Sequence, residues 1–168
     1  MGEGTGSVAG RVVEQTVTVF TFKQDPRGLL LGVAWHARFG GWLVFGGHRE
    51  DCETLDQAAV REVVEEGGCR VRLLPGPSVE LPAGFPHTLV PGPWMIVGME
   101  ASPDNHTPAP HVHQDHVFCA VWVEDVQEPE TRVRWMTEAE VAGTPDLPED
   151  TRLQAQVLFD PVRAVLAG

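Results

Sequence analysis

Three glutamates in the segment 54–68 have the spacing of a metal site. Wound as a helix at about 100° per residue, Glu62, Glu65 and Glu66 fall within an arc of about 100°. Carboxylate oxygens are the ligands that Mg²⁺ and Mn²⁺ prefer. A solvated acidic face is the alternative, but like charges three and four residues apart cost a helix about 0.2–0.5 kcal/mol per pair. No lysine between them offsets this repulsion, so the pattern favours a cation-binding face.

The flanking residues predict how this face is positioned. Thr54 and Gln57 form a capping box, so the helix should begin after Thr54, and Gly67-Gly68 should end it. Upstream, the apolar run 42–45 is typical of a strand that stops at Gly46-Gly47. A turn at these glycines can offer backbone carbonyls to a metal ion.

The run from Gly47 to Cys69 resembles the signature of the Nudix hydrolases, G-x5-E-x7-R-E-U-x-E-E-x-G-U, where U is a bulky aliphatic residue. Every fixed position is filled, and only the last departs, because Cys69 replaces an aliphatic residue and acts as a small hydrophobe. The resemblance implies an α/β (α+β) fold, the Nudix-type α/β/α sandwich with a mixed β-sheet. It also implies water attack on a phosphoanhydride.

The resemblance also assigns roles within the signature. It gives metal binding, with Mg²⁺ or Mn²⁺ as cofactor, to Gly47, Glu62, Glu65 and Glu66. Arg61 matches an arginine that holds the acids in place, and Glu53 matches a glutamate that pairs with it. Either Glu65 or Glu66 would be the general base. A further carboxylate from a later loop is expected in some members, but arginines flank Trp135 at the matching place, so Glu130, Asp115 and Asp104 stay unranked.

A histidine cluster forms a second candidate site. On an extended segment His111, His113 and Asp115 would share one face, with His116 on the other and His106 upstream. Three interpretations stay open. In the first, the histidines have no site role and lie in a hydrated loop and at a strand edge. In the second, His111, His113 and Asp115 bind substrate, and in the third the imidazoles bind zinc.

The residues that indicate the substrate class must lie outside the signature. In this family a downstream tyrosine favours dinucleoside polyphosphates, and the chain has no tyrosine. A proline 15 or 16 residues beyond the signature favours ADP-ribose; here Phe85 is the sixteenth residue and Pro86 the seventeenth. Base stacking would fall to Phe85, Trp94 or Phe22.

Our first hypothesis is hydrolysis of a nucleoside di- or triphosphate, including an oxidised or non-standard nucleotide. An ADP-ribose or nucleotide-sugar pyrophosphatase is the alternative, and a non-enzymatic nucleotide sensor is a third.

Length and composition suit a single domain over residues 8–168, with a disordered start at 1–7. The chain has 168 residues, 42% hydrophobic content and a net charge of −12, which argues against a nucleic-acid partner and leaves a small phosphorylated molecule. The sequence has no apolar run long enough for a membrane span and no secretory signal. Its three cysteines suggest no disulfide framework. We expect a cytoplasmic monomer or homodimer.

Patterning predicts the remaining elements. Strands are expected at 15–23, 29–35, 70–74, 94–100 and 115–123, with a turn at 25–28. A short helix should cover 137–141 behind a capping box of Thr137 and Glu140. A last helix should start at Glu149, with Pro161 as a break or a new first turn.

Overall fold

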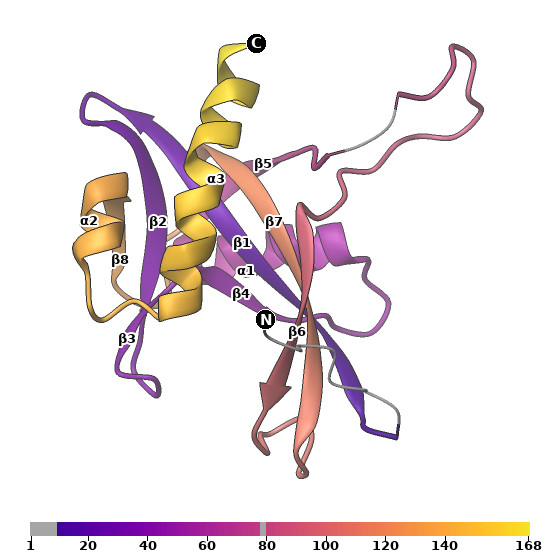
Figure 1. Cartoon of the computed structure of the whole chain (residues 1–168), viewed down its shortest axis with the longest axis vertical. Coiled ribbons are helices and arrows are strands. Elements are labelled where there is room, and N and C mark those ends of the chain that lie inside the picture. The colour runs from indigo at the N-terminus through magenta and orange to yellow at the C-terminus, as the bar shows by residue number, and fades with distance from the viewer. Residues whose placement is uncertain (1–9, 78–79) are drawn as a thin grey trace, which may run out of the picture.

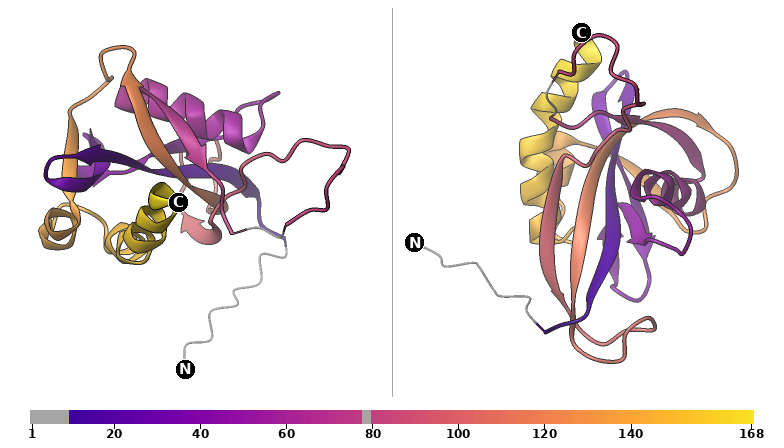
Figure 2. Two further views of the ribbon diagram at one scale, coloured as in Figure 1. Left: turned by 90° about the horizontal axis from the view of Figure 1, so that it is seen from above. Right: turned by 90° about the vertical axis from the view of Figure 1, so that its right-hand side faces the viewer.

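A computed structural model describes residues 10–77 and 80–168; the expected disorder at 1–7 lies outside this range. The described residues form one eight-stranded mixed sheet with helices on both faces (Figures 1 and 2). The α/β/α sandwich expected from the resemblance is therefore confirmed.

Two long strands organise the sheet: β1 (Val13–Asp25) and β7 (His111–Asp125), which pair in parallel. The other pairings between described strands are antiparallel. On the outer edge of β1 lie β2 (Gly28–His36) and β4 (Phe45–His48). On that of β7 lie β5 (Cys69–Leu74) and β6 (Met95–Ala101). The short strands β3 (Gly41–Leu43) and β8 (Val133–Thr137) extend β2.

Alternation along β1 divides the core into two layers. Val17 and Val19 pack in a cluster with Val63 of helix α1 (Leu55–Gly67). Phe20 and Phe22 point the other way, and Phe22 makes an edge-on contact with Phe159. Phe159 belongs to helix α3 (Glu149–Ala167), which follows the short α2 (Glu138–Gly143). Figure 2 shows α1 and α3 on opposite sides of the sheet.

Helix α1 has the predicted ends. The Thr54 amide donates to the Gln57 side chain at 2.9 Å, and Gly68 closes the helix with a φ of 65°. A Cβ at Gly68 would also lie 2.4 Å from the Gln127 carbonyl oxygen, so glycine is required there for both reasons.

Three sequence expectations need correction. The single strand expected at 42–45 is divided, because Gly41–Leu43 pairs with β2 whereas Phe45–His48 pairs with β1. Strand β8 was missed, since its flanks are charged and its pairing with β2 is not local. Pro161 does not break α3. The carbonyl that loses a partner is that of Val157, which lies on an exposed part of the helix where water can replace the missing amide.

No helix in the described ranges is both long and apolar enough to cross a membrane.

Candidate active site

Arg61 is the centre of the polar network on α1. Its Nη2 donates to Glu53 Oε1 at 2.7 Å and its Nε to Glu53 Oε2 at 3.1 Å. Nη1 donates to Glu62 at 2.8 Å and to Glu65 at 3.2 Å, and Nη2 also reaches the His48 carbonyl oxygen at 2.9 Å. One guanidinium thus holds three carboxylates and the end of β4, which is the role the resemblance assigned to it.

The glycines at the end of β4 allow close approach of the helix. A Cβ at Gly47 would lie 2.3 Å from Glu62 Oε1, so a larger residue would force that carboxylate to move. The Gly46 amide donates to Glu66 Oε2 at 2.9 Å. The strand end and the carboxylates are therefore in direct contact.

Burial and mutual repulsion shape the electrostatics of this face. Burial is the largest cause that raises the pKa of Glu66, to about 7, and nearby Glu62, Glu130 and Glu65 add to it. Burial likewise raises the pKa of Glu62, although Arg61 opposes the change. The hydrogen bonds from Arg61 lower the pKa of Glu53. Glu62 and Glu66 are therefore harder to ionise than a solvent-exposed glutamate.

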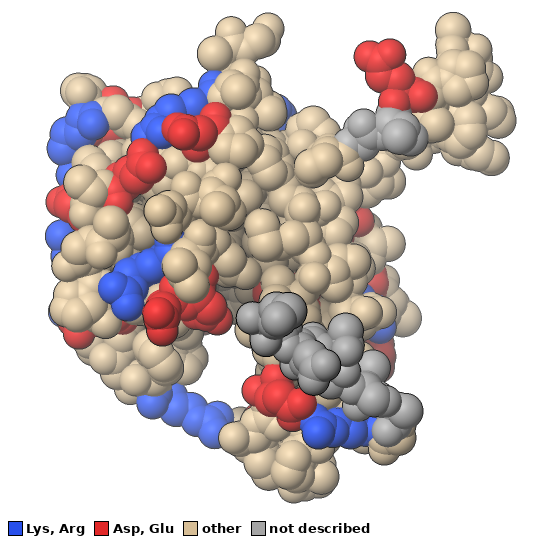
Figure 3. Space-filling view, viewed as in Figure 1, with Lys and Arg blue, Asp and Glu red and all other residues tan. Residues whose placement is uncertain are grey.

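A cavity of about 460 Å³ opens on the other side of β4, within the size range of small-molecule sites. Strands β1, β4 and β7 and the start of α3 supply most of its lining, which includes Thr16, Thr18, Gly46, Gly47, His48, His113, Asp115 and Asp150. Figure 3 shows this side of the molecule hollowed between the body that carries α3 and the projecting strands β6 and β7. Gly47 borders both the cavity and Glu62.

The profile of the NUDIX domain matches residues 14–158 of the chain. The chain belongs to the Nudix family. Together with the complete signature, this membership identifies it as a hydrolase of phosphoanhydrides. A comparison with curated proteins gave no match.

Several solved structures share the fold. A Nudix-family hydrolase from Clostridium perfringens superposes with a TM-score of 0.67 at 20% identity, covering 89% of this chain and 97% of the other. The ORF135 protein of E. coli gives 0.61 at 18% identity, covering 95% and 96%. The NUDIX domain of Shewanella oneidensis NrtR, solved with ADP ribose, gives 0.55 at 20% identity, covering 99% of each chain.

The Nudix signature offers a donor set that suits a hard divalent cation, because all its side-chain donors are carboxylate oxygens. The absent side chain at Gly47 lets the Glu62 carboxylate approach the backbone of β4. Glu65 is more exposed than Glu62, with 45% of its side chain accessible against 12%. In this structure Arg61 draws Glu62 and Glu65 to itself, so the three carboxylates do not meet at one point. The residue types fit the ion.

Glu130 is the later-loop acid that the fold of this Nudix domain brings to the signature. Its amide donates to the Glu65 carbonyl oxygen at 3.3 Å, and its charge is one cause of the raised pKa of Glu66. Asp115 instead accepts a hydrogen bond from Thr16 at 2.8 Å within the sheet, and Asp104 lies in the histidine cluster. Sequence matching could not rank these acids, because the loop between β7 and β8 sets the position of Glu130.

The predicted substrate residues do not all come together. His111, His113 and Asp115 share a face of β7, and His116 points to the opposite face, as alternation predicted. His111 has no exposed surface, whereas His113 and Asp115 line the cavity. Phe85 lies in the long connection between β5 and β6, which projects from the body (Figure 1), and its side chain is exposed. Phe22 belongs to the core, and Trp94 packs against it.

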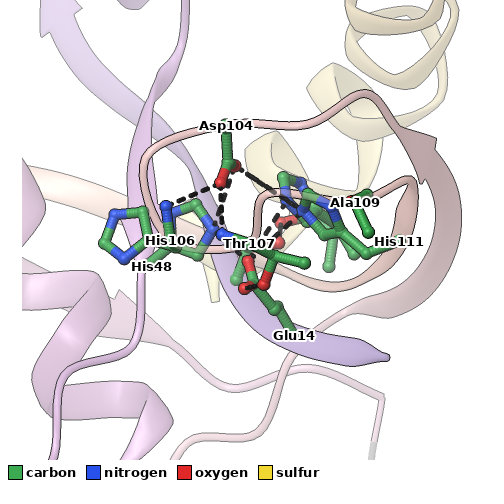
Figure 4. A network of polar contacts seen from close by, with 10 residues as sticks. Glu14, His48, Asp104, His106, Thr107, Ala109 and His111 are labelled. Carbon is green, nitrogen blue, oxygen red and sulfur yellow. Dashed lines mark hydrogen bonds and ion pairs between the residues drawn. The ribbon is translucent and has the colours of Figure 1, made fainter. Parts of the chain in front are cut away.

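The acidic partners of the histidines were not foreseen from the sequence. Within the described part of the chain, only one group of His, Cys, Asp or Glu places three or more ligand atoms within 4.8 Å of one another: Glu14, His48, Asp104 and His113. Figure 4 shows Glu14, Asp104 and His111 directed toward one another beneath the loop that carries Thr107. His48 and His106 stack beside them, with ring centroids 4.1 Å apart.

Proposed function

We propose that the protein is a Mg²⁺- or Mn²⁺-dependent hydrolase that cleaves a phosphoanhydride bond of a nucleoside di- or triphosphate, including an oxidised or non-standard nucleotide. The observation that carries this proposal is the contact between Gly47 and Glu62. It joins the carboxylate face of α1 to the strand end that borders the cavity. A diphosphate in the cavity would then lie beside the cation ligands.

In this proposal the ion is held by Gly47, Glu62, Glu65 and Glu66, and it would neutralise charge on the diphosphate while water attacks phosphorus. Arg61 and Glu53 act as positioning residues, because they fix the glutamates and do not border the cavity. Glu65 or Glu66 accepts the proton of the attacking water, and Glu130 is a candidate for the same role or for a further ligand. No covalent intermediate is required.

The charge of the protein supports a requirement for metal. The net charge is −12, and Asp115 and Asp150 lie in the cavity lining, whereas no lysine or arginine of the described residues does. An anionic substrate would be repelled from this surface without a bound cation. Asp115 and the threonines of β1 are the polar groups available to the rest of the substrate.

The second candidate activity is a pyrophosphatase of ADP-ribose or a nucleotide sugar. It is favoured by the full-length likeness to the NrtR domain that holds ADP ribose. Phe85, one residue before Pro86, would then be the stacking residue, provided that the β5–β6 connection folds toward the cavity. The complete signature favours an enzyme over a non-enzymatic sensor of the same ligand.

We infer a cytoplasmic setting and a small-molecule partner. The three cysteines are all free, and Cys69 and Cys119 are buried, so neither is exposed for pairing. The acidic surface gives no basic footprint for nucleic acid.

The test is a phosphate-release screen across nucleoside di- and triphosphates, ADP-ribose, nucleotide sugars and dinucleoside polyphosphates, with Mg²⁺, Mn²⁺ or chelator. Metal-dependent turnover of nucleoside di- or triphosphates above all other classes supports the first candidate. Preference for ADP-ribose or a nucleotide sugar supports the second. Absence of turnover with every substrate and either metal would contradict both.

A further inference from the structure

We propose a second metal site, for zinc, formed by Glu14, His48, Asp104 and His113, with His111 as an adjoining donor. It lies on the α3 face of the sheet, apart from the signature glutamates, and its evidence does not depend on the proposed activity. Four chain segments supply the donors: β1, β4, the loop before β7, and β7 itself.

The donor atoms are spaced as metal ligands are. Tetrahedral zinc bonds of about 2.0–2.1 Å place neighbouring ligand atoms about 3.4 Å apart. Glu14 Oε2 lies 2.7 Å from His48 Nε2 and 3.7 Å from His113 Nε2. Asp104 Oδ2 lies 3.9 and 3.8 Å from the same two nitrogens. All four donor atoms lie within 4.8 Å of one another, close enough for one ion to draw them together.

His111 adds a third imidazole to this point. Its Nε2 lies 3.4 Å from Glu14 Oε2, 3.6 Å from Asp104 Oδ2 and 2.9 Å from His113 Nε2. The ring is completely buried. Burial of this side chain among two carboxylates and a second imidazole is costly unless their polar atoms have partners, and a cation would satisfy them together.

Outer contacts direct the free atom of several ligands inward. His111 Nδ1 donates to the Ala109 carbonyl oxygen at 2.9 Å, which leaves the Nε2 lone pair facing the cluster. Thr107 donates its hydroxyl to Glu14 Oε1. Asp104 Oδ1 accepts the amides of His106 and Thr107 at 2.8 and 2.9 Å. Each carboxylate therefore keeps its second oxygen for the central point, as in metal sites with an ordered outer shell (Figure 4).

The ligand types select the metal. Imidazole suits zinc and other late transition ions, whereas Mg²⁺ prefers oxygen donors alone. The four donors of the cluster would complete a tetrahedral shell and leave no position for water, so the ion would have a structural role. Such an ion would tie the loop 102–110 to β1, β4 and β7. It would also fix His48, whose carbonyl oxygen accepts from Arg61 and whose neighbour Gly47 contacts Glu62.

The test is the zinc content of tag-free full-length protein after dialysis, together with the visible spectrum after Co²⁺ substitution. We expect stoichiometric zinc and the absorption of tetrahedral Co²⁺ in the wild type. His48→Ala and His113→Ala should weaken zinc binding by about 100-fold or more. Glu14→Gln preserves the shape of the side chain and an oxygen acceptor for Thr107, so loss of zinc in this variant would report the missing charge of a ligand.

Two control variants distinguish zinc bound at this cluster from zinc bound at surface histidines or at the signature. His87→Ala removes an exposed histidine outside the cluster, and Glu66→Gln alters the signature. Both should retain zinc. A wild type that binds neither Zn²⁺ nor Co²⁺, and melts at the same temperature with and without them, would mean that hydrogen bonds alone hold the cluster. Retention of metal in His113→Ala with loss in Glu66→Gln would assign the metal to the signature and overturn the proposal.

Discussion

Arg61 binds Glu53 side-on, with Nη2 2.7 Å from one carboxylate oxygen and Nε 3.1 Å from the other. Glu53 precedes α1 and Arg61 lies in the middle of that helix, so the pair fixes the preceding loop against α1. The remaining guanidinium contacts reach Glu62, Glu65 and the His48 carbonyl oxygen. A lysine has one ammonium group and cannot reproduce this fork.

We therefore predict that Arg61→Lys raises the Mg²⁺ concentration for half-maximal activity. It should also lower kcat/KM by about 10–100-fold, the loss typical of groups that orient metal ligands. Arg163→Lys is the matched control, because Arg163 lies in the second half of α3 and pairs with Glu138 of α2 and with Asp160. If the two variants had equal activity and equal Mg²⁺ requirement, Arg61 would not position the site.

Gly47→Ala should also impair the enzyme. The added Cβ would lie 2.3 Å from Glu62 Oε1, so the carboxylate must move away from the strand end. We expect weaker Mg²⁺ binding, measured by calorimetry, and lower kcat. Gly98→Ala in β6 is the control, since its Cβ meets nothing within 4 Å. Unchanged Mg²⁺ affinity in Gly47→Ala would show that this contact does not matter for the metal.

The stability of the metal-free protein should depend on pH through Glu66. Burial raises the pKa of Glu66 from 4.5 to about 7, so the folded state holds this proton more tightly than the unfolded state. Its contribution to the free energy of unfolding is complete below pH 4.5 and is lost as the pH rises through about 7. Glu66→Gln cannot ionise and should lack this loss.

Urea unfolding in chelator from pH 5 to pH 8 measures the effect as the difference between variant and wild type. We expect Glu66→Gln to gain stability relative to the wild type as the pH rises. Exposed Glu128→Gln should follow the wild type. A constant difference between Glu66→Gln and wild type across this range would argue against the raised pKa.

Metal binding should offset the stability that the metal-free protein loses when Glu66 ionises. A ligand at about 100 times its Kd stabilises a folded protein by about 2.7 kcal/mol, so Mg²⁺ or Mn²⁺ should raise the Tm of the wild type. The rise should shrink in Glu66→Gln, and a thermal scan in each metal measures it. Identical metal-induced shifts in Tm for the two proteins would mean that the cation binds elsewhere. The glutamates would then form only a solvated acidic face.

Local sequence predicted the elements whose signals are local. Thr54 and Gln57 set the start of α1, and Gly68 set its end, because capping depends on neighbouring residues. Thr137 and Glu140 likewise placed α2. Strand β8 escaped prediction because it exists through its pairing with β2, more than ninety residues earlier in the chain. The break predicted at Pro161 is wrong, because α3 is held by tertiary packing and tolerates the loss of one hydrogen bond on its exposed side.

The candidate sites divide in the same way. The acids of the signature lie within a single helix and could be found from their spacing. Glu14 meets His113 only through the parallel register of β1 with β7, and His48 joins them through the pairing of β4 with β1. No single-sequence pattern specifies such registers, so the sequence indicated His111 and His113 but neither Glu14 nor His48 as their neighbours.

Steady-state hydrolysis of the best substrate from the screen, compared between wild type and the isosteric variants Glu65→Gln and Glu66→Gln, tests the central claim most directly. We predict that turnover requires Mg²⁺ or Mn²⁺ and that each variant lowers kcat by about 100-fold or more, since each loses a ligand or the base. Full turnover by both variants in the presence of chelator would contradict metal-dependent hydrolysis by the carboxylate face of α1.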